Sequence, residues 1–163
     1  MEVWDIYNEN REKTGRTIIR GEKLQENEYH LVIHIWIQNS QGEFLIQKRA
    51  STVKSAPNMW AITGGSAITG EDSQSAYKRE LYEEIGLIAD NSKAEIAFSL
   101  KRENNFCDVW LIKQDFDINQ CKLQVEEVSE VKWATVQVIR KLIAKGKFNT
   151  YYYLEDIFRI TQI

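Results

Sequence analysis

The sequence predicts an α/β fold in which helices cover a mixed β-sheet and a β-hairpin precedes the sheet. Residues 30–37 carry apolar side chains at both odd and even positions, as expected for a central strand buried on both faces. Residues 72–85 and 135–145 instead carry apolar side chains at helical spacing. Strand and helix patterns that alternate along one chain are typical of a layered α/β domain.

A β-hairpin is predicted at the N-terminus. Residues 3–7 and 16–20 have the composition of short strands and flank the polar turn 8–15. We expect residues 1–28 to form a hairpin extension of a single domain spanning residues 1–163, because 163 residues is an ordinary length for one domain. The hairpin also offers a surface through which two copies of the chain could pair as a homodimer.

Five further strands are predicted from short apolar or alternating segments bounded by polar turns. They are residues 44–48, 60–62, 94–101, 106–113 and 127–134. Between them lie a loop over 50–59, which contains the only proline, and a polar loop over 114–126. A last helix is predicted near 150–160 from apolar residues at helical spacing.

The helix predicted over 72–85 has start and stop signals. Asp72 is a good residue for a helix start, and Gly86 tolerates the left-handed conformation that follows a last helical residue. An apolar stripe on one side of this helix can pack against a core. The stripe consists of Tyr77, Leu81 and Ile85.

Three carboxylates converge on another face of the same helix. Glu80, Glu83 and Glu84 are spaced at i, i+3 and i+4, which places them side by side. The like charges at i and i+4 destabilise an isolated helix slightly, and Mg²⁺ or Mn²⁺ would relieve that repulsion. The paired glycines Gly64 and Gly65 would let a backbone carbonyl approach the same cation. The alternatives are a solvated acidic face and a simple tight turn.

A single motif contains both the glycine and the acids. Residues 65–87, GSAITGEDSQSAYKRELYEEIGL, fill every fixed position of the pattern G-x5-E-x7-R-E-U-x-E-E-x-G-U, where U is aliphatic. At ordinary residue usage, a chance match is about one in ten million. On this motif, the chain resembles the Nudix family. The resemblance implies an α/β/α sandwich and hydrolysis of a diphosphate linked to another moiety, assisted by a divalent metal.

The resemblance implies a ligand set for that metal. Glu80 and Glu84 match the main metal ligands of the family, with Glu83 close behind, and the carbonyl of Gly64 matches a backbone ligand. The expected cofactor is Mg²⁺ or Mn²⁺. Such an ion would neutralise charge on the diphosphate and lower the pKa of a water molecule.

The resemblance also implies supporting roles for other residues. Glu71 would support or orient the ligands, and Arg79 would form an ion pair that holds the helix and its acids, or else contact phosphate. Nudix enzymes often take the general base or a further metal ligand from a loop outside the motif. The candidates here are Glu126 and Glu127, with Glu127 preferred; the alternative is a solvated loop acid.

The flanking segments resemble the branch that includes isopentenyl diphosphate isomerases and their hydrolase relatives. The isomerases carry a cysteine and a histidine in a C-x-H stretch at the position of residues 63–67, and neither residue is present here. His30 matches a family metal-ligand histidine whose partner is missing, so a packed side chain is the simpler interpretation. A prenyl diphosphate isomerase is therefore the alternative, and a hydrolase is predicted.

The motif defines the bond that is broken but not the group attached to it. A nucleoside diphosphate derivative is the expected substrate, with ADP-ribose-like compounds and oxidised nucleotides also open. Arg49 ends a strand near the glycines and is a candidate phosphate contact, or else a surface charge. A third possibility is a non-catalytic binding module, although such modules usually lose the motif acids that this chain retains.

Composition argues against several other classes. The net charge is −3 and no basic block is present, so neither nucleic-acid nor membrane binding is expected. Cys107 and Cys121 lack C-x-x-C spacing and are expected as free thiols in a reducing compartment. The sequence shows no apolar signal segment and no apolar run of the roughly 20 residues that would span a bilayer. We therefore expect a cytoplasmic protein.

Overall fold

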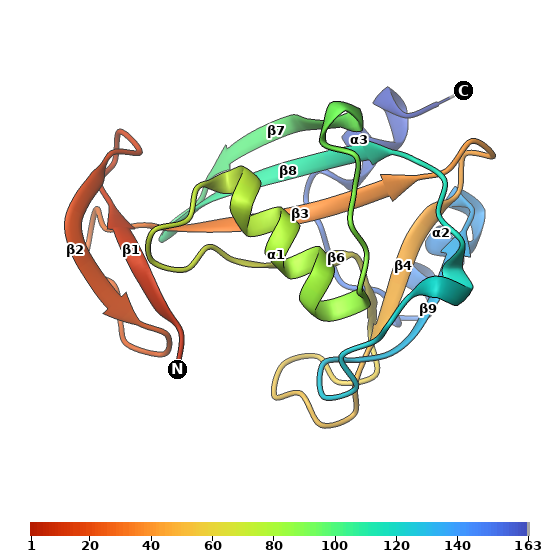
Figure 1. Ribbon diagram of the computed structural model, residues 1–163, viewed down its shortest axis with the longest axis horizontal. Helices are drawn as coiled ribbons and strands as arrows, with labels where there is room; N and C mark the ends of the chain where they lie inside the picture. The colour runs from red at the N-terminus through yellow and green to blue at the C-terminus, as the bar shows by residue number, and fades with distance from the viewer. Residues whose placement is uncertain (163) are drawn as a thin grey trace.

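The computed structural model describes residues 1–162 and shows a small N-terminal sheet beside a larger mixed sheet with helices on both faces (Figure 1). The elements are β1 (Val3–Tyr7), β2 (Lys13–Ile19), β3 (His30–Gln38), β4 (Phe44–Arg49), β5 (Trp60–Ala61), β6 (Thr63–Ser66), α1 (Ser73–Ile85), β7 (Ala94–Lys101), β8 (Asn105–Lys113), β9 (Val128–Ala134), α2 (Val136–Ala144) and α3 (Leu154–Ile160). Short 3₁₀ turns lie at Asn91–Lys93 and Ile118–Gln120. Within this described part, no helix is both long and apolar enough to cross a membrane.

The larger sheet has seven strands, with β3 at its centre. β3 runs parallel to β8 along its whole length, and β7 pairs antiparallel with β8. On its other side, β3 pairs with β4 at the single position Gln38–Phe44, while β6 pairs with it over Val32–Ile35. β4 therefore turns away from β3 and pairs with β5 and β9 instead. This divergence leaves room beside β6 for the groove described below.

Alternate residues of β3 face two separate cores. Ile33 and Ile35 pack with α1 on one face, whereas Trp36 packs on the other face with residues of α2 and α3. The α1 residues in the first core are those of the predicted apolar stripe, Tyr77, Leu81 and Ile85, all fully buried. The predicted central strand and the α/β/α sandwich are therefore confirmed. Because α1 is fixed by this packing, its acidic residues have a fixed direction.

The N-terminal hairpin is tied to the main sheet by a partly buried ion pair. Arg11, in the hairpin turn, donates from Nη1 to Oδ1 of Asp108 on β8 at 2.7 Å, and Asp108 is fully buried. Burial by itself raises the pKa of the Asp108 carboxyl. The hydrogen bonds from Arg11 and Ser99 outweigh that effect and hold the pKa below its usual range. The hairpin therefore has a defined position relative to β3 and α1.

The largest differences from the predicted bounds are at the starts of β2 and α3. β2 begins at Lys13 rather than near residue 16, because the Asn8 side chain accepts from the backbone N–H groups of Asn10 and Glu12 and closes the turn early. The glycine pair lies within strand β6 rather than in a tight turn. The last helix starts at Leu154 rather than near residue 150. Tyr151 and Tyr153 instead turn inward, where Tyr151 accepts a hydrogen bond from the Ile62 N–H and Tyr153 lies against His34, while Tyr152 is exposed.

Candidate active site

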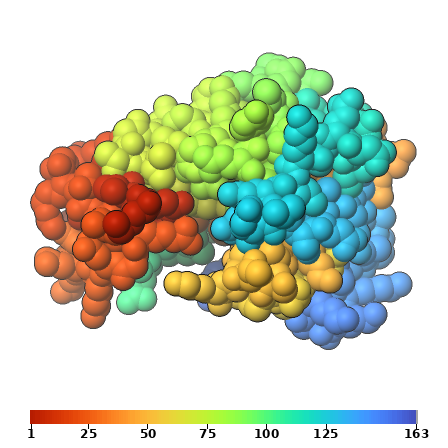
Figure 2. Space-filling model, turned by 60° about the horizontal axis from the view of Figure 1, so that its bottom comes forward, coloured from red at the N-terminus to blue at the C-terminus, as the bar shows by residue number. Residues whose placement is uncertain are grey.

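A groove of about 260 Å³ lies where the hairpin, β6, α1 and two loops meet. In the space-filling view the surface is hollowed between the red-orange hairpin and the gold and cyan loops (Figure 2). The groove brings together six residues that the sequence singled out: Arg49, Gly64, Glu80, Glu83, Glu84 and Glu127. Glu71 and Arg79 lie behind this lining. Residues from positions 49 to 127 therefore converge on one site.

Helix α1 is fixed at both ends. At its start, the Asp72 side chain accepts from the Ser75 N–H at 2.8 Å, and the Ser75 hydroxyl in turn accepts from the Asp72 N–H at 3.0 Å. At its end, Gly86 adopts the left-handed conformation with φ of 70°. This reciprocal cap and the glycine stop confirm the predicted helix signals. They define the rotation of the helix and hence the direction of its carboxylates.

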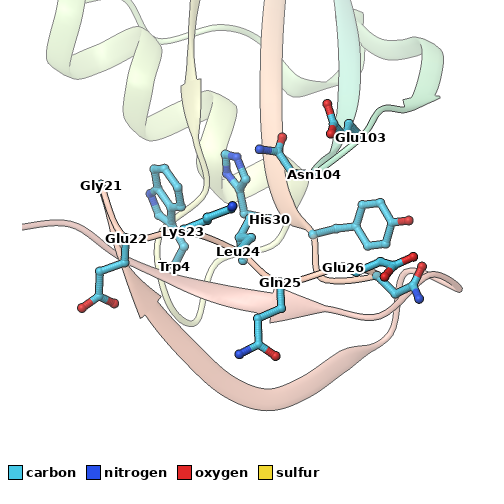
Figure 3. A pocket seen from close by; sticks show the side chains of 12 residues that line it. Trp4, Gly21, Glu22, Lys23, Leu24, Gln25, Glu26, His30, Glu103 and Asn104 are labelled. Carbon is cyan, nitrogen blue, oxygen red and sulfur yellow. The ribbon is translucent and has the colours of Figure 1, made fainter.

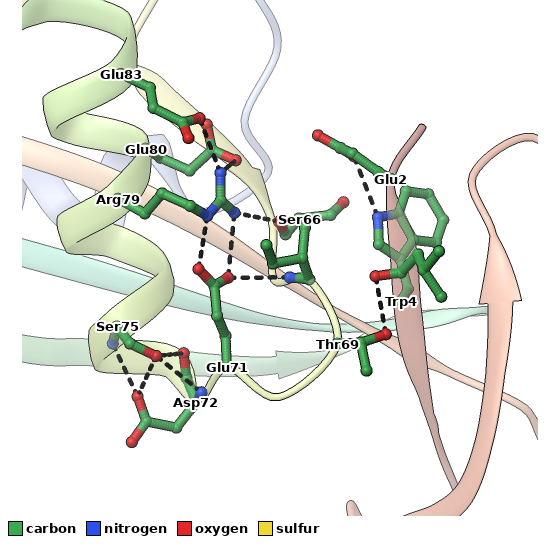
Figure 4. A network of polar contacts seen from close by, with 12 residues as sticks. Glu2, Trp4, Ser66, Thr69, Glu71, Asp72, Ser75, Arg79, Glu80 and Glu83 are labelled. Carbon is green, nitrogen blue, oxygen red and sulfur yellow. Dashed lines mark hydrogen bonds and ion pairs between the residues drawn. The ribbon is translucent and has the colours of Figure 1, made fainter.

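Arg79 links the acids of the motif to one another (Figure 4). Its Nε donates to Glu71 Oε1 at 2.6 Å, and its Nη1 donates to Glu80 and Glu83, each at 3.0 Å. Its Nη2 donates to the Ser66 carbonyl at 3.0 Å. Glu71 also accepts from the Ile68 N–H at 2.9 Å, so Arg79 is held by the segment that precedes the helix. Of the two roles predicted for Arg79, this geometry supports the ion pair.

Among the acids of the groove, Glu80 is buried and Glu84 is partly buried, whereas Glu83 and Glu127 are more exposed. Burial raises the pKa of Glu80 to about 7, although Arg79 opposes the shift. Burial also raises the pKa of Glu84 to about 8; the hydrogen bond from Gln47 lowers it, and repulsion from Glu80 adds to the rise. Glu84 keeps some exposure toward the groove. When both carboxylates are ionised, the positive charge that the protein itself supplies nearby is too small to compensate them.

The residues present fit a hard divalent cation. Two oxygen donors are supplied by Glu80 and Glu84, and Gly65 has no Cβ to push the Glu80 carboxylate away. Within residues 1–162, no three acidic, histidine or cysteine side chains stand close enough together to ligate one ion as they are placed. Arg79 holds Glu80 and Glu83, while Gln47 holds Glu84. The half-exposed Glu83 is therefore a predicted ligand that this geometry leaves untested.

Gln47 is a site residue that sequence reasoning missed. Its Nε2 donates to Glu84 Oε2 at 2.8 Å, and its Oε1 accepts from the Thr63 hydroxyl at 2.7 Å. Both Gln47 and Thr63 are buried. The available signal was a glutamine directly after three apolar strand residues, 44–46, because a buried amide at that position needs hydrogen-bond partners.

The end of β4 places Arg49 at the groove, and the loop before β9 places Glu127 there. The Ala50 N–H donates to the Glu127 carbonyl at 2.9 Å, which joins the loop after β4 to the loop before β9. Arg49 donates from Nε to the Ser55 carbonyl at 2.9 Å and lines the groove. Glu127 is exposed, and its charge contributes to the raised pKa of Glu84. Both predicted residues therefore lie near the acid pair.

The histidines are packed rather than placed among the acids. His34 lies 2.7 Å from the Tyr153 hydroxyl, and His30 stacks on Trp4 with ring centroids 4.0 Å apart. Burial lowers the pKa of His30 to about 4. His30 and Trp4 line a larger cavity of about 810 Å³ between the hairpin and the loop that follows it (Figure 3). That cavity contains no residue of the acidic motif, so the candidate site is the smaller groove.

The layered fold and the acid-lined groove agree with one class of protein, the hydrolases that act on phosphorus-containing acid anhydrides. The chain belongs to the Nudix family, because the NUDIX domain matches residues 28–156. The match begins after the N-terminal hairpin. It includes the whole motif over 65–87 and the loop that carries Glu127.

Relatives and solved structures agree with this family. An uncharacterised Nudix hydrolase of Listeria monocytogenes is 44% identical over 161 residues, which cover 98% of this chain and 95% of that protein. A crystal structure from Deinococcus radiodurans shares the fold with a TM-score of 0.78 at 23% identity, covering 99% of this chain and 100% of that one. The NUDIX domain of Shewanella oneidensis NrtR, solved with ADP ribose, has a TM-score of 0.59 at 14% identity and covers 87% and 89%. The isopentenyl diphosphate isomerase-like branch is not tested by these matches.

Proposed function

We propose that this protein is a metal-dependent pyrophosphohydrolase that cleaves the diphosphate bridge of a nucleoside diphosphate derivative by water attack at phosphorus. The observation that carries the proposal is the pair Glu80 and Glu84, two enclosed carboxylates with raised pKa values beside a glycine strand. An enclosed acid pair of this kind is unfavourable unless a cation compensates its charge.

The metal-binding residues follow from the donor set. Glu80, Glu84 and the Gly64 carbonyl would hold Mg²⁺ or Mn²⁺, with Glu83 as a further ligand once it leaves Arg79. The chemistry that such an ion supplies when bound is charge neutralisation of the diphosphate and a lowered pKa for the attacking water.

The other residues of the groove have supporting roles. Arg79 and Glu71 fix the direction of the ligands through the hydrogen bonds described above. Glu127 lies on a loop at the groove and is the proposed general base, which would take a proton from the attacking water. Arg49 is the proposed contact for a phosphate oxygen, because a guanidinium group can donate two parallel hydrogen bonds to phosphate.

The size of the groove supports a substrate whose diphosphate alone is enclosed. A volume of about 260 Å³ is below the roughly 300–1,000 Å³ typical of pockets that enclose a whole ligand. The group attached to the diphosphate would therefore lie outside the groove, against neighbouring surfaces. The ADP ribose bound by the Shewanella domain supports a nucleoside diphosphate derivative as the substrate class.

The isomerase alternative is less well supported by the positions of the thiols. Cys107 is fully buried in the core on the side of α2 and α3, and burial raises its pKa to about 11. Cys121 packs at the edge of the opposite core. Neither sulfur lines the groove, so neither is placed for proton transfer to a substrate carbon. Both thiols are free, which supports a reducing compartment such as the cytoplasm.

A substrate panel tests the proposed function. ADP-ribose, nucleoside diphosphates and oxidised nucleotides are incubated with the protein in Mg²⁺, in Mn²⁺ and in excess chelator, and phosphate and nucleoside monophosphate are measured. We expect at least one compound to be cleaved only when metal is present, and Glu84→Gln to abolish cleavage in a folded protein. Equal turnover in excess chelator would refute the proposal. An allylic isomer of unchanged mass from a prenyl diphosphate would establish the isomerase instead.

A further inference from the structure

The N-terminal hairpin supplies one wall of the groove. Arg20, which directly follows β2, and Glu2, which precedes β1, both line the groove together with Gly65 and Glu80. Glu2 lies across the groove from Glu80 and Glu83 in the close view (Figure 4). The hairpin lies outside the matched NUDIX segment, so this wall is an addition to the family domain.

Arg20 is held at this wall by a chain of contacts that ends on the central strand. Its backbone N–H donates to the Glu2 carbonyl at 3.0 Å, and its Nη1 donates to Glu2 Oε2 at 3.1 Å. The same oxygen of Glu2 accepts from Trp4 Nε1 at 3.3 Å. Trp4 in turn stacks on His30 of β3, with the ring planes only 5° apart (Figure 3). The position of Arg20 is therefore set by the main sheet.

The charge of the groove calls for cations that face the substrate. Five glutamates and two arginines, Arg20 and Arg49, line it. A diphosphate anion is repelled by that many carboxylates unless metal and arginine compensate. The Arg20 side chain is 66% exposed and bonds to one carboxylate oxygen, so most of its five N–H donors are available. An exposed pair of this kind is weak and can be exchanged for a phosphate contact.

We propose that Arg20 is a phosphate-binding residue that contacts the substrate diphosphate from the hairpin wall, opposite Arg49. Glu2 and Trp4 are positioning residues that hold Arg20 toward the groove. This inference rests on the proposed function, because it names a contact for the same diphosphate. It assigns the hairpin a role in substrate binding in addition to any role in stability.

Inorganic pyrophosphate tests this contact directly, because it is the part common to all candidate substrates. Its dissociation constant is measured by calorimetry in Mg²⁺ for the wild type, Arg20→Ala and Arg16→Ala. Arg16 is the matched control, since it lies on β2, the strand that Arg20 directly follows, is 62% exposed, and pairs with Glu28 away from the groove. We expect Arg20→Ala to weaken pyrophosphate binding about tenfold and Arg16→Ala to change it by less than about twofold. In turnover of the best-cleaved compound, KM should rise by a similar factor with little change in kcat.

Two further variants keep the test decisive. Arg20→Lys retains the charge but loses the planar fork, so its affinity should lie between those of the wild type and Arg20→Ala. If Arg20→Ala does not fold by circular dichroism, Arg20→Gln replaces it. Unchanged affinity in the Arg20 variants, or an equal loss in Arg16→Ala, would overturn the inference while the proposed function stands. A wild type that binds no pyrophosphate and cleaves no diphosphate with metal would overturn both.

Discussion

Gly65→Ala should separate activity from stability at this site. A Cβ built on Gly65 overlaps the Glu80 carboxyl group, and even the more distant oxygen, Oε2, would be only 2.9 Å away. Since a carbon and an oxygen atom normally approach to about 3.3–3.6 Å, the whole Glu80 carboxylate must move by about 1 Å. That shift breaks the 3.0 Å hydrogen bond from Arg79 and moves a proposed metal ligand.

The expected effect on catalysis is large and the effect on folding is modest. A 1 Å displacement of a reacting constellation can reduce the rate about 100-fold. The obstructing group is the end of a flexible side chain, so overpacking should cost about 1–2 kcal/mol and lower Tm by several degrees. The assay compares kcat/KM for the best-cleaved diphosphate, the Mn²⁺ affinity and the thermal melting of the variant with those of the wild type.

Gly146→Ala provides the matched control. Gly146 has φ of 67° and nothing within 4 Å of an added Cβ, and it follows α2 outside the groove lining. The same chemical change there strains the backbone and costs about 1 kcal/mol without touching the acids. We expect Gly146→Ala to melt earlier but to keep its activity. If Gly65→Ala retains activity within threefold of the wild type, the reasoning about Glu80 is wrong.

Three further predictions concern the acids and the hairpin. Gln47→Leu removes the hydrogen bond that lowers the pKa of Glu84, and we expect the pKa of Glu84 to rise above about 8. Binding of Mn²⁺, measured by calorimetry, should then require a higher pH than in the wild type. In chelator, the stability contributed by Glu80 and Glu84 is fully present below their unfolded pKa near 4.5 and is lost as pH rises through about 7 to 8. Tm in chelator should therefore fall between about pH 4.5 and about pH 8. If the addition of Mg²⁺ at pH 8 does not restore Tm, a metal site is contradicted. Arg11→Ala leaves the Asp108 carboxylate buried without its charged partner. We expect the free energy of unfolding, measured in urea, to fall by about 2 kcal/mol, which is less than for a fully buried pair because Arg11 is one-third exposed. A decrease below about 0.5 kcal/mol would refute the anchoring role.

Local patterns account for the elements that the sequence predicted well. Helix α1 was predicted from its cap residue, its terminal glycine and its apolar stripe, and each feature depends only on neighbours within a few turns. The central strand β3 was predicted from apolar residues on both of its faces. The start of α3 was placed too early, because inward-facing tyrosines before Leu154 have tertiary partners that no local pattern reveals.

The sequence by itself predicted the class of chemistry through the motif over 65–87, and helical periodicity alone predicted that the acids of α1 lie on one face. Only the tertiary structure decided what surrounds them. Gln47 reaches Glu84 because β4 diverges from β3, and Arg20 reaches the groove because the hairpin docks through Arg11. The physical reason is that periodicity fixes neighbours within an element, whereas contacts between distant segments depend on sheet register and on burial shared by the whole fold.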